Sequence, residues 1–327
     1  MIVALAGGVG GAKLAQGLQL ALPPGDLAVV VNTADDFDLF GLRICPDLDT
    51  VLYTLAGLAN PETGWGIAGD TAATLGALAR LGRDPWFRLG DQDFATHIHR
   101  TERLGAGATL TAVAAELADA LGVPSRLLPM TDDRVATLVD TPAGRLEFQE
   151  YFVRRRQRDD VLGVSFAGID DARLPDGVAA AIAAAELIVV CPSNPIVSVG
   201  PILAVPGMRA ALEAAAAPVV AVSPIVGGRA LKGPADRMLG TLGHAVSAAG
   251  VAGLYAGWVD AMVLDAADGD QAPTIAAELG MATLVTDTVM GAAESRRRLA
   301  EEVLAFGRGL VAGRGRPSPV PAGSGAP

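Results

Sequence analysis

The feature that most constrains the fold is an alternation between short apolar, β-branched runs and longer stretches rich in alanine and leucine. The clearest apolar runs cover residues 2–6, 27–31, 187–191 and 219–222. These runs are continuously hydrophobic, as is typical of parallel strands covered by helices on both faces. Helical stretches occur at residues 12–21, 177–186, 208–217, 234–242 and 292–306. The sequence therefore predicts an α/β fold, a Rossmann-like, mostly parallel sheet with helices on both faces.

The middle of the chain departs from this alternation. Residues 135–139, a Thr-Pro-Ala-Gly turn and residues 145–153 predict a small antiparallel hairpin. We expect it to belong to an inserted hairpin and helical segment, about residues 65–160, within a single domain over residues 1–310. Residues 311–327 are rich in Gly, Pro, Ser and Ala, a composition that predicts a disordered tail.

Composition excludes several classes of protein. Lys and Arg number 25 and Asp and Glu 36, a net charge of −11, so no basic stripe is present to bind nucleic acid. The N-terminus does not resemble a signal peptide, and no apolar run reaches the roughly 18 residues of a membrane span. Cys45 and Cys191 are too few for a disulfide framework. We expect a cytoplasmic protein that binds neither nucleic acid nor a membrane.

A glycine-rich segment, Gly7-Gly8-Val9-Gly10-Gly11-Ala12-Lys13, follows the first apolar run. Glycines there let backbone N–H groups approach a phosphate, or they simply allow a tight turn from strand to helix. The side chain of Lys13 is expected to face either the bound phosphate or solvent. The third glycine of a dinucleotide-binding fingerprint would fall on Lys13, and Asn32 follows the second strand where an NAD-binding acid is expected, so an NAD-dependent oxidoreductase is disfavoured. The candidate phosphate contacts are Gly8, Gly10, Gly11 and Lys13.

Carboxylates gather after the second apolar run, at the sheet edge where open α/β sheets bind ligands. Asp35 and Asp36 come first, and Asp47 and Asp49 follow in Pro-Asp-Leu-Asp-Thr. Unpaired carboxylates this close attract a hard cation, and Mg²⁺ combines one or two of them with water and phosphate oxygens. We expect Asp47 and Asp49 to be metal ligands and Asp35 or Asp36 to be a general base, with Asp49 also part of the catalytic set. Helix capping is the alternative for Asp47 and Asp49.

Other side chains are candidates for ligand contacts. Ser193 and Asn194 follow a predicted strand and suit a guanine edge or a phosphate, or form a plain connector. Arg229, with Lys232, could hold an anionic group or face solvent. Trp65 could stack on a flat ring or lie in the core. His97 is either a hydrogen-bond donor to a phosphate or a structural residue.

Blocks of sequence in the same order resemble the CofD/FbiA family, the 2-phospho-L-lactate transferases of coenzyme F-420 biosynthesis. The resemblance extends over residues 1–287. The blocks include Gly7-Gly8-Val9-Gly10-Gly11-Ala12-Lys13-Leu14, Pro46-Asp47-Leu48-Asp49-Thr50, Gly64-Trp65-Gly66, Leu89-Gly90-Asp91 and Pro192-Ser193-Asn194-Pro195.

The resemblance implies a reaction and its participants. The primary alcohol of the deazaflavin Fo would attack a guanylylated phospholactate or phosphoenolpyruvate, and GMP would leave. It also implies Mg²⁺, a homodimer, and contacts to Fo from Asp49 and Arg88. A nucleotide-sugar-binding regulatory protein of similar fold, without turnover, is the alternative. The acid carried by the donor, whether lactate, enolpyruvate or glycerate, has no signature in the sequence.

Overall fold

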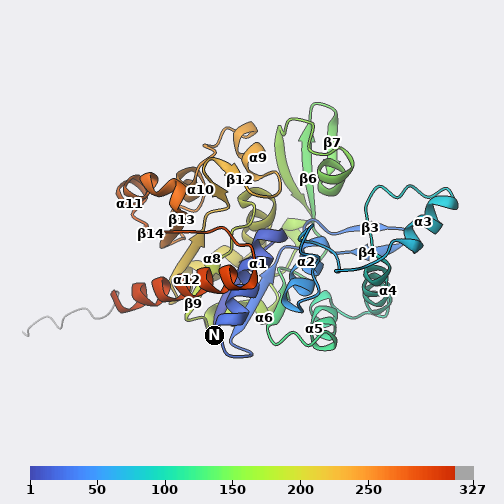
Figure 1. Cartoon of the computed structure of the whole chain (residues 1–327), viewed down its shortest axis with the longest axis horizontal. Helices are drawn as coiled ribbons and strands as arrows, with labels where there is room; N and C mark the ends of the chain where they lie inside the picture. The colour runs from blue at the N-terminus through green and yellow to red at the C-terminus, as the bar shows by residue number, and fades with distance from the viewer. Residues whose placement is uncertain (314–327) are drawn as a thin grey trace, which may run out of the picture.

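A seven-stranded parallel sheet forms the centre of the molecule in the computed structural model, which describes residues 1–313 (Figure 1). Its strands are β1 (Ile2–Ala6), β2 (Leu27–Val31), β5 (Arg126–Pro129), β9 (Leu187–Val190), β10 (Val219–Val222), β13 (Ala261–Asp265) and β14 (Ala282–Thr286). Every neighbouring pair is parallel, in the order β14-β13-β10-β9-β1-β2-β5. The predicted Rossmann-like fold is confirmed.

The strand order reverses direction at β1. The chain proceeds outward from β1 through β2 to β5 and then returns, so that β9 pairs with the other side of β1. In the register of the sheet, Ala6 of β1 lies beside Val31, and Leu5 lies beside Val190. Crossovers leave β1 on opposite faces at such a point, and a crevice opens beyond the carboxyl ends of the strands.

Helices cover both faces of the sheet, and successive β1 side chains enter different cores. Ala4 belongs to a core formed with α1 (Gly8–Ala21), α2 (Pro46–Leu55), α5 (Leu110–Ala120) and α12 (Ala293–Gly313). Val3 and Leu5 belong to a core formed with α6 (Asp176–Ala183), α8 (Met208–Ala214), α9 (Ala235–Thr241), α10 (Ala248–Leu254) and α11 (Ala272–Leu279). Figure 1 shows α1 and α12 packed side by side. The two-sided burial explains the continuously apolar strand sequences.

Two additions project from this framework (Figure 1). Between β2 and β5 the chain forms a hairpin and two further helices, namely β3 (Phe37–Leu39), β4 (Leu42–Ile44), α3 (Ala73–Arg80) and α4 (Asp91–Gly105). Between β5 and β9 it forms a three-stranded antiparallel sheet from β6 (Ala136–Thr141), β7 (Gly144–Glu147) and β8 (Gly163–Ala167). Both additions extend beyond the carboxyl edge of the parallel sheet and supply walls to the cavity described below.

The predicted hairpin is confirmed, but its second strand is shorter than expected. β7 ends at Glu147, and residues 150–154 form a π-helical turn, η1 (Glu150–Arg154). Phe148 is buried in a small core and stacks on Phe152, which favours a helical turn over continued strand pairing. The third strand, β8, pairs with β6 and was not predicted, because its Gly-Val-Ser-Phe-Ala sequence is short and weakly apolar.

Helix ends also differ from the predictions. α1 begins at Gly8, so the glycines expected in a turn form its first helical turn. α12 continues to Gly313, so residues 311–313 of the predicted tail are helical, and the rest of that prediction lies outside the described residues. The remaining elements are η2 (Ile169–Asp171), η3 (Pro195–Val199), α7 (Gly200–Ala204), β11 (Ile225–Val226), β12 (Arg229–Ala230) and η4 (Ala266–Gln271).

Within residues 1–313 no single helix has both the length and the apolar composition needed to cross a membrane. One pair, Pro195–Ala204 with Met208–Ala214, meets that test only when taken together, and it bends by 85°.

The α1–α12 contact generates a stability prediction. A Cβ added at Gly17 of α1 would overlap the backbone carbonyl of Arg296, whereas Gly309 of α12 has open space around it. We expect Gly17→Ala to lower the free energy of unfolding by about 1–3 kcal/mol through overpacking. Gly309→Ala should be neutral or stabilising, because alanine is the better helix former. Urea denaturation of the two variants checks this, and equal stabilities would contradict the close packing.

Candidate active site

A cavity of about 620 Å³ opens at the carboxyl edge of the sheet, beyond the ends of the adjacent strands β1 and β9. It is lined by the start of α1, one side of α2, the segment before α4, and the turns after β9 and β10. Both additions to the framework also contribute side chains. Among the predicted site residues, those on the wall are Gly8, Gly10, Lys13, Asp35, Asp47, Asp49, Trp65, Arg88, His97, Ser193 and Asn194.

Glycines at the start of α1 allow three parts of the chain to meet. Gly7 donates its backbone N–H to Ser193 Oγ at 3.0 Å, and a Cβ there would lie 2.6 Å from Asp47 Oδ2. A Cβ at Gly11 would lie 2.5 Å from Ser193 Oγ, and one at Gly10 would overlap the carbonyl of residue 192. Gly8 has φ +62°, which favours glycine. Packing alone therefore requires Gly7, Gly10 and Gly11, and Gly11 does not reach the cavity wall.

Asp35 and Asp47 are two buried carboxylates on the cavity wall, and no basic side chain within residues 1–313 forms an ion pair with either. Asn32 Nδ2 donates to Asp47 Oδ2 at 3.0 Å, while Asp35 Oδ1 has no hydrogen-bond partner among the same residues. Burial raises the pKa of Asp35 well above its usual range, and the Asp47 carboxylate raises it further. Burial raises the pKa of Asp47 to about 6, although hydrogen bonds from Asn32 and the Gly8 backbone oppose the rise. Removal from water and mutual repulsion thus both disfavour two negative charges here.

Asp36 lies behind this wall. It is absent from the main cavity and borders a small hollow together with Asp35. Arg43 Nη2 is 3.7 Å from Asp36 Oδ2, and burial raises the pKa of Asp36 to about 7 despite that positive charge. Of the two candidate bases, only Asp35 faces the main cavity.

Asp49 points toward a buried arginine that sequence reasoning missed. Arg100 of α4 is fully buried and forms a two-pronged ion pair with Asp49, its Nη1 donating to Asp49 Oδ2 at 3.1 Å. The same Nη1 lies 3.2 Å from His97 Nδ1. A signal was available, because Asp93, His97 and Arg100 recur at helical spacing while Ile98, on the other side, is 54% exposed. Here the polar residues share one side of α4 and the apolar residue is exposed, which is the reverse of the usual amphipathic helix. The pattern therefore indicates that the inner face of α4 is polar.

Of the three basic side chains Lys13, Lys232 and Arg229, two line the cavity and one does not. Lys13 Nζ donates to the Met290 carbonyl at 2.7 Å at the cavity wall, and burial lowers the pKa of Lys13. Lys232 Nζ donates to the Thr63 carbonyl, also on the wall. Arg229 is exposed on β12 and is not a wall residue, so Lys232 is the member of that pair that reaches the cavity.

The turn after β9 uses its polar side chains locally. Ser193 Oγ accepts the Gly7 N–H, and Asn194 Oδ1 caps η3 by accepting the backbone N–H groups of Ile196 and Val197. Both residues still reach the wall. The connector interpretation of this motif therefore has direct structural support, while contact with a ligand stays a prediction.

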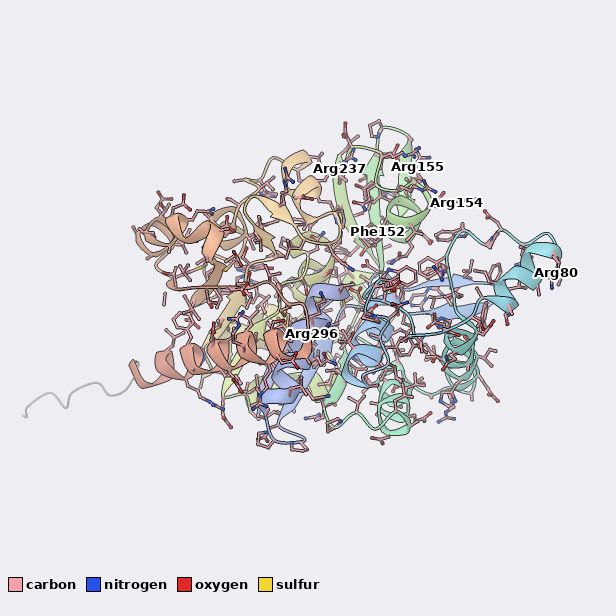
Figure 2. The ribbon with its side chains drawn as sticks, in the orientation of Figure 1. Arg80, Phe152, Arg154, Arg155, Arg237 and Arg296 are labelled. Carbon is pink, nitrogen blue, oxygen red and sulfur yellow. The ribbon has the colours of Figure 1, made fainter. Side chains whose placement is uncertain are left out.

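Aromatic rings dominate another part of the wall. Trp86 and Phe87 pack edge to face, with ring centroids 5.6 Å apart, and Phe152 stacks on Phe148 in the cavity lining. Figure 2 shows Phe152 and Arg154 on η1, and the Arg154 guanidinium lies 5.9 Å from the Trp86 ring. Trp65 is 42% exposed, so core burial does not account for it. These rings suit a flat, apolar ligand surface.

The buried carboxylates differ in how well they suit a metal ion. Within residues 1–313 no three His, Cys, Asp or Glu side chains form a group that could hold a metal ion. Mg²⁺ does not need such a group, because it is commonly held by one or two carboxylates, water and substrate phosphates. Asp35 and Asp47 fit this requirement through oxygen donors and an unpartnered Oδ1. Asp49 fits less well, since Arg100 already neutralises it.

The two carboxylates of α2 should respond differently to loss of charge. Asp49→Asn would leave the Arg100 guanidinium buried and unpaired, and we expect a loss of about 3–5 kcal/mol in the free energy of unfolding. Asp47 has no ion-pair partner that would be left without a counter-charge. We therefore expect Asp47→Asn to leave the free energy of unfolding unchanged or to raise it. Chemical denaturation at neutral pH measures both, and an unchanged stability of Asp49→Asn would contradict the buried pair.

Comparisons with known proteins agree with the fold. A crystal structure of a UPF0052 family protein from Bacillus halodurans superposes with a TM-score of 0.61 at 16% identity, covering 93% of this chain and 98% of that one. The chain is 45% identical over 316 residues to a phosphoenolpyruvate transferase from Streptomyces griseus, covering 93% of this chain and 99% of the relative.

A 2-phospho-L-lactate transferase from Methanosarcina mazei is 40% identical over 304 residues, with 93% and 99% of the two chains covered. The family model described as 2-phospho-L-lactate transferase CofD matches residues 2–297. With this match over nearly all of the described sequence, the chain belongs to the CofD family.

Proposed function

We propose that the protein transfers a phospholactyl or phosphoenolpyruvyl group from a guanylylated donor to the deazaflavin Fo in coenzyme F-420 biosynthesis. The observation that carries the proposal is a cavity whose wall combines two chemically different sets of side chains. One set is the unneutralised Asp35 and Asp47, and the other is the rings of Trp86, Phe87 and Phe152. A diphosphate with its cation suits the first set, and a flat deazaflavin suits the second.

The reaction is a displacement at phosphorus. The ribityl hydroxyl oxygen of Fo forms a bond to the phosphorus that carries the acid, and the bond from that phosphorus to the bridging oxygen breaks. GMP leaves with the electron pair, and the hydroxyl proton passes to Asp35 or to solvent. Such transfers depend on alignment and charge neutralisation more than on covalent chemistry of the protein.

Asp47 and Asp35 are the residues that would hold Mg²⁺, and the ion when bound neutralises negative charge on the diphosphate. Asn32 orients Asp47 by donating to Oδ2, and the Gly8 N–H adds a second hydrogen bond to the same carboxylate. Lys13 and Lys232 add positive charge on the wall. Arg88 also lines the cavity, and the family resemblance implies that it contacts Fo. The same resemblance implies a homodimer, and the low cysteine count favours the cytoplasm.

The decisive experiment is product analysis. Purified protein with Mg²⁺, Fo and each guanylylated donor should give the corresponding phosphodiester and GMP, identified by mass spectrometry. A nucleotide-binding regulatory protein would bind a donor and form neither product. Comparison among the lactyl, enolpyruvyl and glyceryl donors would identify the acid.

A variant that removes the charge of Asp35 should have opposite effects on the stability of the metal-free protein and on its stabilisation by Mg²⁺. Because the folded protein raises the pKa of Asp35 and Asp47, their ionisation destabilises the metal-free fold, increasingly as pH rises above the ordinary carboxyl pKa. We expect Asp35→Asn to melt a few degrees higher than wild type at pH 7.5 in a chelator. It should lose the stabilisation by Mg²⁺ and at least about 100-fold in transfer rate.

Thermal melts with and without Mg²⁺, from about pH 5 to 8, measure both effects. Asp38→Asn is a matched control, since Asp38 is half-exposed and already paired with Arg134. An Asp35→Asn variant that keeps the full stabilisation by Mg²⁺ would remove Asp35 from the metal site.

A further inference from the structure

The inner face of α4 is polar and meets a polar face of α2. Asp93, His97 and Arg100 follow one another at spacings of four and three residues, and Asp49 and Tyr53 are four apart on α2. All five side chains are buried. Two helices that meet through titratable groups rather than apolar ones need each group to have a defined partner.

Arg100 determines where the proton of His97 resides. A guanidinium carries only donors, so the contact of 3.2 Å between Arg100 Nη1 and His97 Nδ1 is a hydrogen bond only when Nδ1 accepts. Burial lowers the pKa of His97 to about 4, and the positive charge of Arg100 adds to this effect, although Asp49 opposes it. The imidazole is therefore neutral near pH 7, with its proton on Nε2.

That Nε2–H has no partner within the described part of the chain. Its atom is buried and makes no hydrogen bond, the His97 side chain is only 2% exposed, and the residue lines the cavity. Leu89, Trp86 and Phe87, in the segment just before α4, line the same cavity. A buried donor without a partner, in a residue that lines a ligand cavity, is a group that a bound molecule can satisfy.

We propose that Arg100 holds His97 as its Nε2–H tautomer so that this N–H donates to an uncharged oxygen or nitrogen acceptor on the ring system of bound Fo. This inference rests on the proposed function. His97 is then a ligand-contacting residue, and Arg100 is a positioning residue that acts through it. The His97 N–H needs an acceptor lone pair on the ligand ring. It therefore favours flat ligands that carry such an acceptor over flat ligands that do not.

Charge distinguishes this acceptor from the phosphate that the sequence alone suggested for His97. Asp49 Oδ2 is 3.6 Å from His97 Nδ1, and the Asp93 carboxylate shares the same cavity wall. A phosphate at Nε2 would share the wall with the Asp93 carboxylate, and Arg100, already paired with Asp49, would not compensate its charge. A carbonyl oxygen or ring nitrogen accepts the same hydrogen bond without that repulsion.

The tautomer can be measured on the wild-type protein without any ligand. The chain has three histidines, so a ¹⁵N-histidine spectrum is simple, and the spectrum of His97→Gln assigns the His97 signals. We expect a neutral Nε2–H ring for His97 from about pH 6 to 8. An Nδ1–H tautomer, or an imidazolium near pH 7, would overturn the inference. Adding Fo should shift the Nε2 proton signal, and an unchanged signal at saturating Fo would also overturn it.

Two conservative variants separate ligand contact from a purely structural role. The amide of Gln reaches about as far as Nε2, whereas the amide of Asn reaches about as far as Nδ1. His97→Gln should therefore retain a donor to Fo, and His97→Asn should retain only the acceptor for Arg100. We expect His97→Asn to bind Fo about 3–10-fold more weakly with little change in melting temperature. His97→Gln should bind within about 3-fold of wild type.

Fluorescence titration with Fo gives the affinities. Binding by His97→Asn that equals wild type, or equal losses in both variants, would show that His97 acts only on Arg100. A wild-type protein that binds no Fo would instead reject the proposed function together with the acceptor, while the ligand-free spectrum still decides the tautomer.

Discussion

The structure depends on how the charges of four buried carboxylates at one sheet edge are balanced, because within residues 1–313 only two of them form an ion pair with an arginine. Asp49 is neutralised by the fully buried Arg100, which fixes α4 against α2. Asp36 has only the more distant Arg43, while Asp35 and Asp47 have no such pairing within residues 1–313. A buried charge without a partner is costly, so the site stores a repulsion that a bound divalent ion would relieve. In the proposed site, stability and metal binding would therefore be coupled at Asp35 and Asp47.

The scaffold makes this arrangement possible through close backbone approach. β1 and β9 are neighbours, and their following turns meet at Gly7 and Ser193. Larger residues at Gly7 or Gly10 would displace Asp47 or the turn after β9. The glycine-rich start of α1 is therefore explained first by packing, and its backbone N–H at Gly8 is directed at a carboxylate of the chain. A phosphate would then be reached through the cation that this carboxylate holds.

The parallel sheet was predictable because each central strand is a short, continuously apolar run, which is typical of a strand buried on both faces. The grouping of Asp35, Asp47 and Asp49 followed from their position after a strand in such a sheet. Their separate roles did not, since the partner of Asp49 lies in a helix about fifty residues later and sequence spacing carries no information about that contact. The same limit applies to Arg229 and Lys232, which are neighbours in sequence but only one reaches the cavity.

In the proposed reaction, the distribution of charge along the wall would distinguish the two substrates that share the cavity. Near Asp35, Asp47 and Lys13 the wall carries charges of both signs, so a diphosphate with its cation satisfies it. Beside His97, the buried Asp49 and Arg100 neutralise each other. The imidazole therefore presents an uncharged N–H near aromatic rings, which discriminates by hydrogen bonding rather than by charge. In the proposed reaction, this difference in electrical character would keep the two ligands from exchanging places.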